Sequence, residues 1–143
     1  MKHLDLSSNQ ISELPDGIFK NLTNLKVLDL AYNQICELSS NLFHSLVCLE
    51  KLYLESNLLT NIPKGLFSNL ISLKFLNLCD NQISIIPEGI FKNLVSLEEL
   101  GMEQKNIIPF KKEFFKDLLC LKYFITKGHD SLRVDLNYYD IYV

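Results

Sequence analysis

The sequence repeats itself every 24 residues, and this period constrains the fold more than any other feature. When the segment 73–96 is shifted by 24 residues in either direction, the same skeleton of residues returns. If the positions of each repeat are numbered 1 to 24 from Met1, the first four repeats hold leucine at positions 4 and 6, asparagine at position 9 and phenylalanine at position 19. Such a period is typical of a solenoid, in which each repeat buries its apolar residues against its neighbours.

Positions 3–8 of each repeat predict a short β-strand. The segment 26–31, Lys-Val-Leu-Asp-Leu-Ala, alternates apolar and polar side chains, as a half-buried strand does. Stacked in order, these strands form a parallel sheet. The leucines at positions 4 and 6 then point into the core, while the side chains at positions 3, 5, 7 and 8 point out to the inner, concave face.

The asparagine at position 9 stands where each strand ends and the chain turns. Its side chain can bond to backbone groups of its own turn and of the next coil, which would otherwise be buried without partners. The phenylalanines at position 19 fill the outer half of the core and widen that edge, so the stack should curve. We predict a structural ladder formed by Asn9, Asn33, Asn57 and Asn81.

The pattern LxxLxLxxNxIxxLPxGxFxxLxx resembles the typical 24-residue class of leucine-rich repeat, which is familiar from Toll-like receptors, Slit-like proteins and small leucine-rich proteoglycans. The resemblance covers residues 1–118 closely. It implies an α/β-type solenoid: a curved stack with a parallel β-sheet on the concave face and mostly irregular or short helical turns on the convex face.

The predicted domain organisation is one stack of repeats with an altered end. The fifth repeat departs from the pattern, with Lys105 in place of asparagine, and the next unit has Thr126 and His129 where apolar residues or asparagine are expected. We predict five repeats over 1–120 (1–24, 25–48, 49–72, 73–96 and 97–120), and a degenerate sixth repeat or makeshift C-terminal cap over 121–143.

Composition restricts the kind of partner and leaves the compartment open. A formal charge of −3 and a pI near 5.6 give no basic stripe for nucleic acid. No apolar run reaches the roughly 18 residues that suggest a membrane span. The resemblance favours an extracellular or cell-surface setting, but no signal peptide is visible, because Met1 already occupies the first position of a repeat.

The four cysteines are expected to be free thiols. Cys48 and Cys120 share position 24 but are three repeats apart, which is roughly 14 Å at the spacing of strands in a sheet. A disulfide tolerates about 7 Å between Cα atoms. Cys36 and Cys79 occupy different positions nearly two repeats apart.

No arrangement of residues predicts catalysis, a cofactor or a metal site. Cys79 is the outward thiol of the strands, and the histidine of that face, His3, is three repeats away, so no nucleophile and base meet. Asp5 and Asp29 are neighbours, but two carboxylates fall short of the six to eight oxygens that Ca²⁺ takes. The five glycines are isolated and form no phosphate-binding loop.

The concave face carries the candidate binding residues. Tyr32, Tyr53 and Phe75 fall on adjacent strands, and exposed aromatic residues on a rigid surface suit a protein-binding hot spot. Single surface aromatics are also normal, and carboxylates on this face also fit a solvated surface. If the face binds, its carboxylates favour a basic or neutral partner. The candidate residues are Val27, Asp29, Tyr32, Lys51, Tyr53, Glu55, Phe75, Asn77, Asp80 and Glu99.

The leading functional hypothesis is therefore a non-catalytic protein–protein recognition module that binds its partner on the concave sheet. The alternative is a structural spacer segment of a longer leucine-rich repeat receptor or matrix protein. Asn21 begins an Asn-Leu-Thr sequon in a convex turn and is a possible glycosylation site. The first repeat would expose its apolar side and the edge of its strand, which predicts possible self-association through an uncapped N-terminal end.

Overall fold

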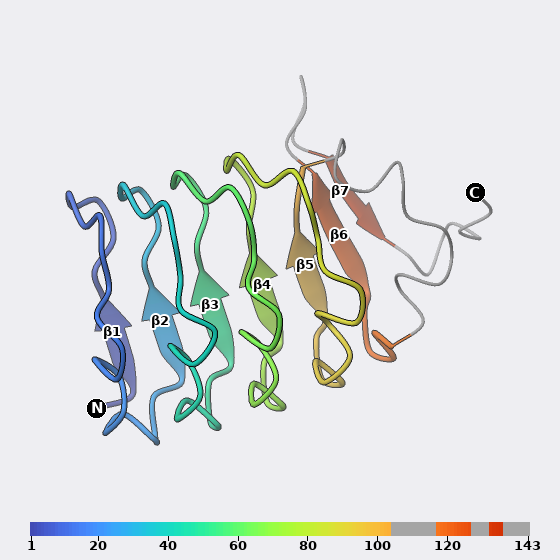
Figure 1. Ribbon diagram of the computed structural model, residues 1–143. Helices are drawn as coiled ribbons and strands as arrows, with labels where there is room; N and C mark the ends of the chain where they lie inside the picture. Colours follow the sequence, from blue (N-terminus) through green and yellow to red (C-terminus); the bar gives the residue numbers. More distant parts are fainter. Residues whose placement is uncertain (104–116, 127–131, 136–143) are drawn as a thin grey trace.

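One sheet runs the length of the chain, with its strands in sequence order (Figure 1). The structure is a computed structural model that describes residues 1–103, 117–126 and 132–135. Strands β1 to β6 are parallel, and β7 pairs antiparallel with β6. The strands are β1 (His3–Asp5), β2 (Val27–Asp29), β3 (Lys51–Tyr53), β4 (Phe75–Asn77), β5 (Glu99–Gly101), β6 (Tyr123–Thr126) and β7 (Leu132–Asp135).

The register of the sheet reproduces the 24-residue period. Leu28 pairs with Leu52, and Leu52 with Leu76, so each position-4 leucine lies beside its counterpart in the next coil. From β2 to β5 this central leucine is buried, while its two neighbours in the strand face the other side of the sheet. The predicted solenoid with a parallel sheet is confirmed.

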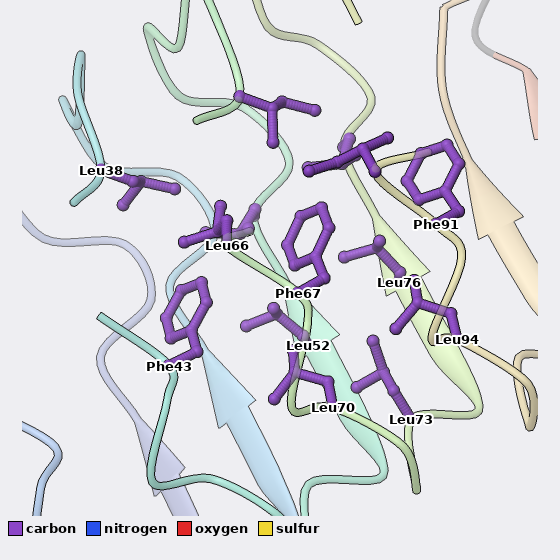
Figure 2. Packing of buried hydrophobic residues seen from close by; sticks show 14 of the residues in the cluster. Leu38, Phe43, Leu52, Leu66, Phe67, Leu70, Leu73, Leu76, Phe91 and Leu94 are labelled. Atoms are coloured by element: carbon purple, nitrogen blue, oxygen red, sulfur yellow. The ribbon is translucent and has the colours of Figure 1, made fainter. Parts of the chain in front are cut away.

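The core lies between the sheet and the outer turns. Figure 2 shows Phe43, Phe67 and Phe91 following one another along the stack, beside the strands. The rings of Phe67 and Phe91 are stacked, with centroids 6.3 Å apart. Phe19 and Phe43 repeat this contact at 6.2 Å. Because each coil adds one ring to the row, the outer half of the core is continuous from the first repeat to the fourth.

Reverse turns make up the outer side of the described coils, and no helix forms among the described residues. In the first repeat the N–H groups of Ile18 and Lys20 donate to the carbonyl oxygens three residues earlier, those of Pro15 and Gly17. Gly17 has φ of 74°, a left-handed conformation that favours glycine. The turns of the third and fourth repeats use Gly65 and Gly89 in the same way.

At the C-terminal side the chain reverses direction. β7 lies antiparallel to β6, with Phe124 opposite Val134. The sequence predicted a degenerate sixth repeat or a makeshift cap over 121–143, and β7 covers Leu132–Asp135 within that range. The described residues do not include Lys105, His129 or 136–143, so the division into five repeats and a degenerate unit stays a prediction. All four cysteines are free thiols.

Candidate protein-interaction surface

The side chains at positions 3, 5, 7 and 8 define the strand face, which is the predicted concave face. The register places position 3 of successive strands in one row and position 5 in a second row. Most candidate residues on the strands are half-buried, and Lys51 is exposed. The first row contains Val27, Lys51, Phe75 and Glu99, and the second contains Asp29, Tyr53 and Asn77.

A tilted aromatic pair occupies the middle of the strand face. The rings of Tyr53 on β3 and Phe75 on β4 have centroids 4.8 Å apart and planes inclined by 40°. Burial raises the pKa of the Tyr53 hydroxyl, and the charges of Asp29, Glu55 and Glu99 raise it further. Tyr53 therefore keeps its proton at neutral pH and stands as a hydrogen-bond donor among three carboxylates.

Tyr32 lies on the same face, in the turn that follows β2. It is 59% exposed, and its N–H donates to the carbonyl oxygen of Glu55 at 3.0 Å. Its φ of 55° is in the left-handed region, which is unusual for a bulky residue. The same conformation occurs at position 8 of the other three repeats, at Ser8, Ser56 and Asp80. The backbone of each of the first four coils thus adopts this conformation, and in the second coil an exposed aromatic residue accepts it.

Position 5 residues also have a local structural role. A side-chain oxygen of Asp29 accepts the N–H of Ala31 at 3.0 Å, and Asn77 accepts the N–H of Cys79 at 3.1 Å. Asp5 does the same for the N–H of Ser7 at 2.9 Å. The Ser7 hydroxyl donates to the same oxygen at 2.7 Å, and this second bond is the main reason that the pKa of Asp5 is lowered. These contacts fix the turns after β1, β2 and β4.

Position 7 does not reach solvent in every coil, which corrects the expectation that it points out to the concave face. Ala31 and Cys79 are both buried. A Cβ on Gly101 would lie 2.3 Å from Oδ1 of Asn77 and 3.2 Å from the Cys79 sulfur, so these side chains cover the glycine. The Cys79 thiol donates to the carbonyl oxygen of Ile125 at 3.7 Å. Cys79 is therefore a packed residue and not an outward thiol.

The strand face is strongly acidic. Its described residues include six carboxylates and a single lysine, Lys51, which leaves a formal charge of −5. Since the whole chain carries −3, the rest of the chain carries +2. Asp80 accepts a bond from the Ser56 hydroxyl at 2.8 Å, and its N–H donates to Glu103 at 2.7 Å. The carboxylates are Asp5, Asp29, Glu55, Asp80, Glu99 and Glu103.

The position-9 asparagines divide into one exposed and three buried side chains. Asn9 is exposed and donates only within its own turn, to the carbonyl oxygens of Leu6 and Ser7. Asn33, Asn57 and Asn81 are buried. Each of these donates to its own turn and to the preceding coil, and each accepts one backbone N–H of that coil. The expected bond to the next coil is thus made to the preceding one.

Asn21 is exposed in an outer turn, as is Thr23, the third residue of its sequon. Between them Leu22 packs against the core. This arrangement leaves the carboxamide of Asn21 open to solvent. Its glycosylation stays a prediction.

No group of three or more His, Cys, Asp or Glu side chains that could hold a metal ion occurs among the described residues. The described parts of the chain also contain no helix long and apolar enough to cross a membrane. Asp5 and Asp29 lie opposite each other in the register of β1 and β2, but each binds the N–H of its own turn.

Comparison with known proteins identifies the family. The sequence model of the leucine rich repeat family matches residues 1–59 and again 49–107. The chain belongs to the leucine-rich repeat family. A comparison with curated proteins found no significant match.

Two solved leucine-rich repeat structures illustrate the likeness. TLR13, in a complex with the RNA ssRNA13, is 31% identical with a TM-score of 0.79, and the match covers 89% of this chain. A leucine-rich repeat protein of Leptospira interrogans is 33% identical with a TM-score of 0.76, over 90% of this chain. The matched region is 19% of the TLR13 chain and 31% of the Leptospira chain, so this chain spans a minor part of either. Leucine-rich repeats commonly mediate protein–protein interaction and are typically non-catalytic.

Proposed function

We propose that this leucine-rich repeat chain is a non-catalytic recognition module whose strand face binds a basic protein partner. The observation that carries the proposal is the Tyr53–Phe75 pair, which stands on two adjacent strands of a rigid sheet. Aromatic residues are enriched in binding hot spots because they bury a large area with few rotatable bonds.

The charge of the strand face specifies the chemistry of the partner. Tyr53 lies among Asp29, Glu55 and Glu99, whose charges all act on its hydroxyl. A lysine or arginine of a partner would meet both the ring faces and the carboxylates, which is a favourable combination for a cation. The same charge disfavours RNA as a ligand, although the TLR13 neighbour was solved with an RNA.

Tyr32 supports the assignment independently. A bulky residue in the left-handed region costs about 1–2 kcal/mol relative to the right-handed conformation. Asparagine or glycine would adopt that backbone with less strain. An exposed aromatic at a position that penalises it is consistent with a role outside folding.

The experiment is a selection from a phage-displayed peptide library on the immobilised 143-residue chain. We expect enrichment of peptides rich in arginine and lysine. The Tyr53→Ala/Phe75→Ala variant should lose their binding while retaining its melting temperature within a few degrees. Lys20→Ala, an exposed change on an outer turn, is the matched control and should bind like the parent.

The alternative function, a spacer within a longer receptor or matrix protein, makes the opposite prediction. In that case no peptide depends on the strand face, and enriched peptides bind the double variant and the Lys20→Ala variant equally. The extracellular or cell-surface setting stays a prediction from the family resemblance. Glycan occupancy of Asn21, measured by mass spectrometry after expression in secreting eukaryotic cells, tests whether the site is accessible there.

A further inference from the structure

Each coil enters its strand through a tight turn on one flank of the stack. In this entry turn the N–H of position 1 donates to the carbonyl oxygen of position 22 in the preceding repeat. The bond from Leu49 to Leu46 is 3.0 Å, and that from Leu73 to Leu70 is also 3.0 Å. The same bond closes the turns at Leu25, Leu97 and Leu121. Because the geometry recurs, the residues at the turn tips form a column along the stack.

Four successive tips of this column are apolar and exposed. Tight turns usually carry glycine, proline, asparagine, aspartate or serine. Here position 23, the second residue of each turn, is instead aliphatic with 43–79% exposure. Single exposed aliphatic residues are ordinary, but a row on adjacent coils forms a continuous apolar surface. This flank stripe consists of Val47, Ile71, Val95 and Leu119.

A ladder of alternating charges follows the stripe, three residues further along each coil. Glu50 accepts bonds from Lys26 at 2.5 Å and from Lys74 at 3.3 Å. Lys122 pairs with Glu98 at 2.8 Å. The rungs thus read, in order, Lys26, Glu50, Lys74, Glu98 and Lys122.

We propose that the flank stripe binds a second copy of this chain, packed antiparallel about a two-fold axis. Such an interface is isologous, so the same patch must complement itself. An axis that passes between Ile71 and Val95 places Ile71 opposite Val95 of the second copy. It likewise places Val47 opposite Leu119 of the second copy, so all four apolar tips are covered.

The ladder favours an axis between two rungs, and coverage of all four tips selects the axis between Ile71 and Val95. With the axis between Ile71 and Val95, Lys74 faces Glu98 of the second copy and Glu50 faces Lys122 of the second copy. Every facing pair of rungs is then opposite in charge. An axis through a rung would instead oppose Lys74 to itself and Glu50 to Glu98. Complementary charges of this kind fix the register of an interface more than its affinity.

The backbone of the flank argues against an added strand as the occupant. The position-1 N–H groups are engaged within the entry turns, and the carbonyl oxygen of Val47 accepts the Ser72 hydroxyl at 3.0 Å. A β-strand partner needs unpaired backbone groups at a sheet edge. Four side chains from each copy make a small contact, and interfaces of that size are typically transient.

The test is sedimentation of the full 143-residue chain over a wide concentration range. We expect a reversible monomer–dimer equilibrium. Ile71→Ser/Val95→Ser should be monomeric throughout and melt like the parent, because both side chains are exposed. Ile85→Ser is the matched control: this residue is 71% exposed, at position 13 in the segment after β4, so its loss should leave the dimer intact. A parent chain that is monomeric throughout overturns the proposal.

Charge exchange tests the two-fold register. Lys74→Glu alone opposes Glu98 of the second copy with a like charge, and Glu98→Lys alone does the same to Lys74. Each single variant should lose its homodimer, while an equimolar mixture of the two should form a heterodimer with opposite charges at both pairs. Failure of the mixture to associate overturns the register. Association that survives in Ile71→Ser/Val95→Ser overturns the proposal, and a contact through β1 becomes the next candidate.

Discussion

The side chain of Asn57 donates to the carbonyl oxygen of Leu30 at 2.9 Å, and this bond ties the third coil to the second. Its oxygen accepts the N–H of Ile35 at 3.1 Å. Asn57→Ala leaves these buried backbone groups without partners, which should reduce the free energy of unfolding by about 1–3 kcal/mol. Denaturant titration followed by circular dichroism measures the change.

Asn9→Ala is the control for that measurement. Asn9 occupies the same position of its repeat but is exposed and bonds only within its own turn. Water can satisfy the groups that it releases, so the loss should be clearly smaller than for Asn57. Equal losses of stability would mean that burial of the asparagine side chain is not the cause of its contribution.

The second prediction concerns the row of phenylalanines. Phe67 is fully buried, and its ring stacks on Phe91. Phe67→Ala should leave a cavity between the third and fourth coils and destabilise the chain by about 3–5 kcal/mol. Thermal melts measure the change. Ile85→Ala, which truncates an exposed aliphatic side chain, is the control and should have little effect, because it leaves no cavity.

The features shared by all repeats could be predicted from the sequence, whereas contacts that depend on particular neighbouring coils could not. The period alone is enough to align Leu28, Leu52 and Leu76, because a parallel register offset by 24 residues is the arrangement that buries all of them together. The direction of the asparagine bonds could not be predicted, since residue type does not say which neighbouring coil supplies the carbonyl group. The burial of Cys79 depends on Gly101 and Ile125, which lie 22 and 46 residues further along the chain.

The candidate site was likewise predictable in part from the sequence. The sequence placed Tyr53 and Phe75 on adjacent strands, but the 4.8 Å contact depends on rotamers that no pattern encodes. The left-handed conformation of Tyr32 was also not predictable, because tyrosine disfavours it and only the geometry of the coil imposes it. The flank stripe could have been found from the sequence, because four repeats have an aliphatic residue at position 23. The pattern appears when the exposed positions of the repeats are aligned as well as the buried ones.

The third prediction uses the strain at Tyr32. Tyr32→Ala and Tyr32→Gly remove the same aromatic ring, but only glycine accepts φ of 55° without strain. We therefore expect the glycine variant to be more stable than the alanine variant by about 1 kcal/mol. Both should weaken binding of the peptides selected on the strand face. Identical stabilities would show that the position-8 backbone relaxes on substitution.

The fourth prediction is a pH dependence of stability that arises from the ladder of alternating charges. The pKa of Glu50 is lowered by its bonds to Lys26 and Lys74, and that of Glu98 by Lys122. A carboxyl whose pKa is lower in the folded state stabilises it at pH values above its unfolded pKa, about 4.3. That contribution disappears as the pH falls through the folded value, so the melting temperature should decline in this acid range.

Glu50→Gln tests the origin of that decline. The variant cannot lose a charge, so its melting temperature should fall less than that of the parent between pH 5 and the acid limit. The difference should be small and should shrink in high salt, because the pairs are exposed to solvent. A parent and variant with parallel pH profiles would exclude a contribution from this rung.

The last prediction compares two amides that make the same bond at different places in the stack. The N–H of Leu6 donates to the backbone carbonyl oxygen of Asp29 at 2.8 Å, and the N–H of Leu78 donates to that of Gly101 at 2.9 Å. Both occupy position 6 and both bond to the following coil, but Leu6 is half-buried, whereas Leu78 is buried within the core. Hydrogen exchange depends on the free energy of local opening.

In the 143-residue polypeptide we therefore expect the Leu6 amide to exchange faster than the Leu78 amide, since opening β1 breaks contacts with β2 alone, while opening β4 breaks contacts with β3 and β5. Fusing a generic polar capping unit before Met1 should slow exchange at Leu6 and raise the melting temperature. Exchange at Leu6 as slow as at Leu78 without the added unit would mean that the first coil is covered in solution. The Ile71→Ser/Val95→Ser variant leaves the first coil unchanged. If exchange at Leu6 stays slow in that variant, the protection comes from a contact at β1 and not from association through the flank stripe.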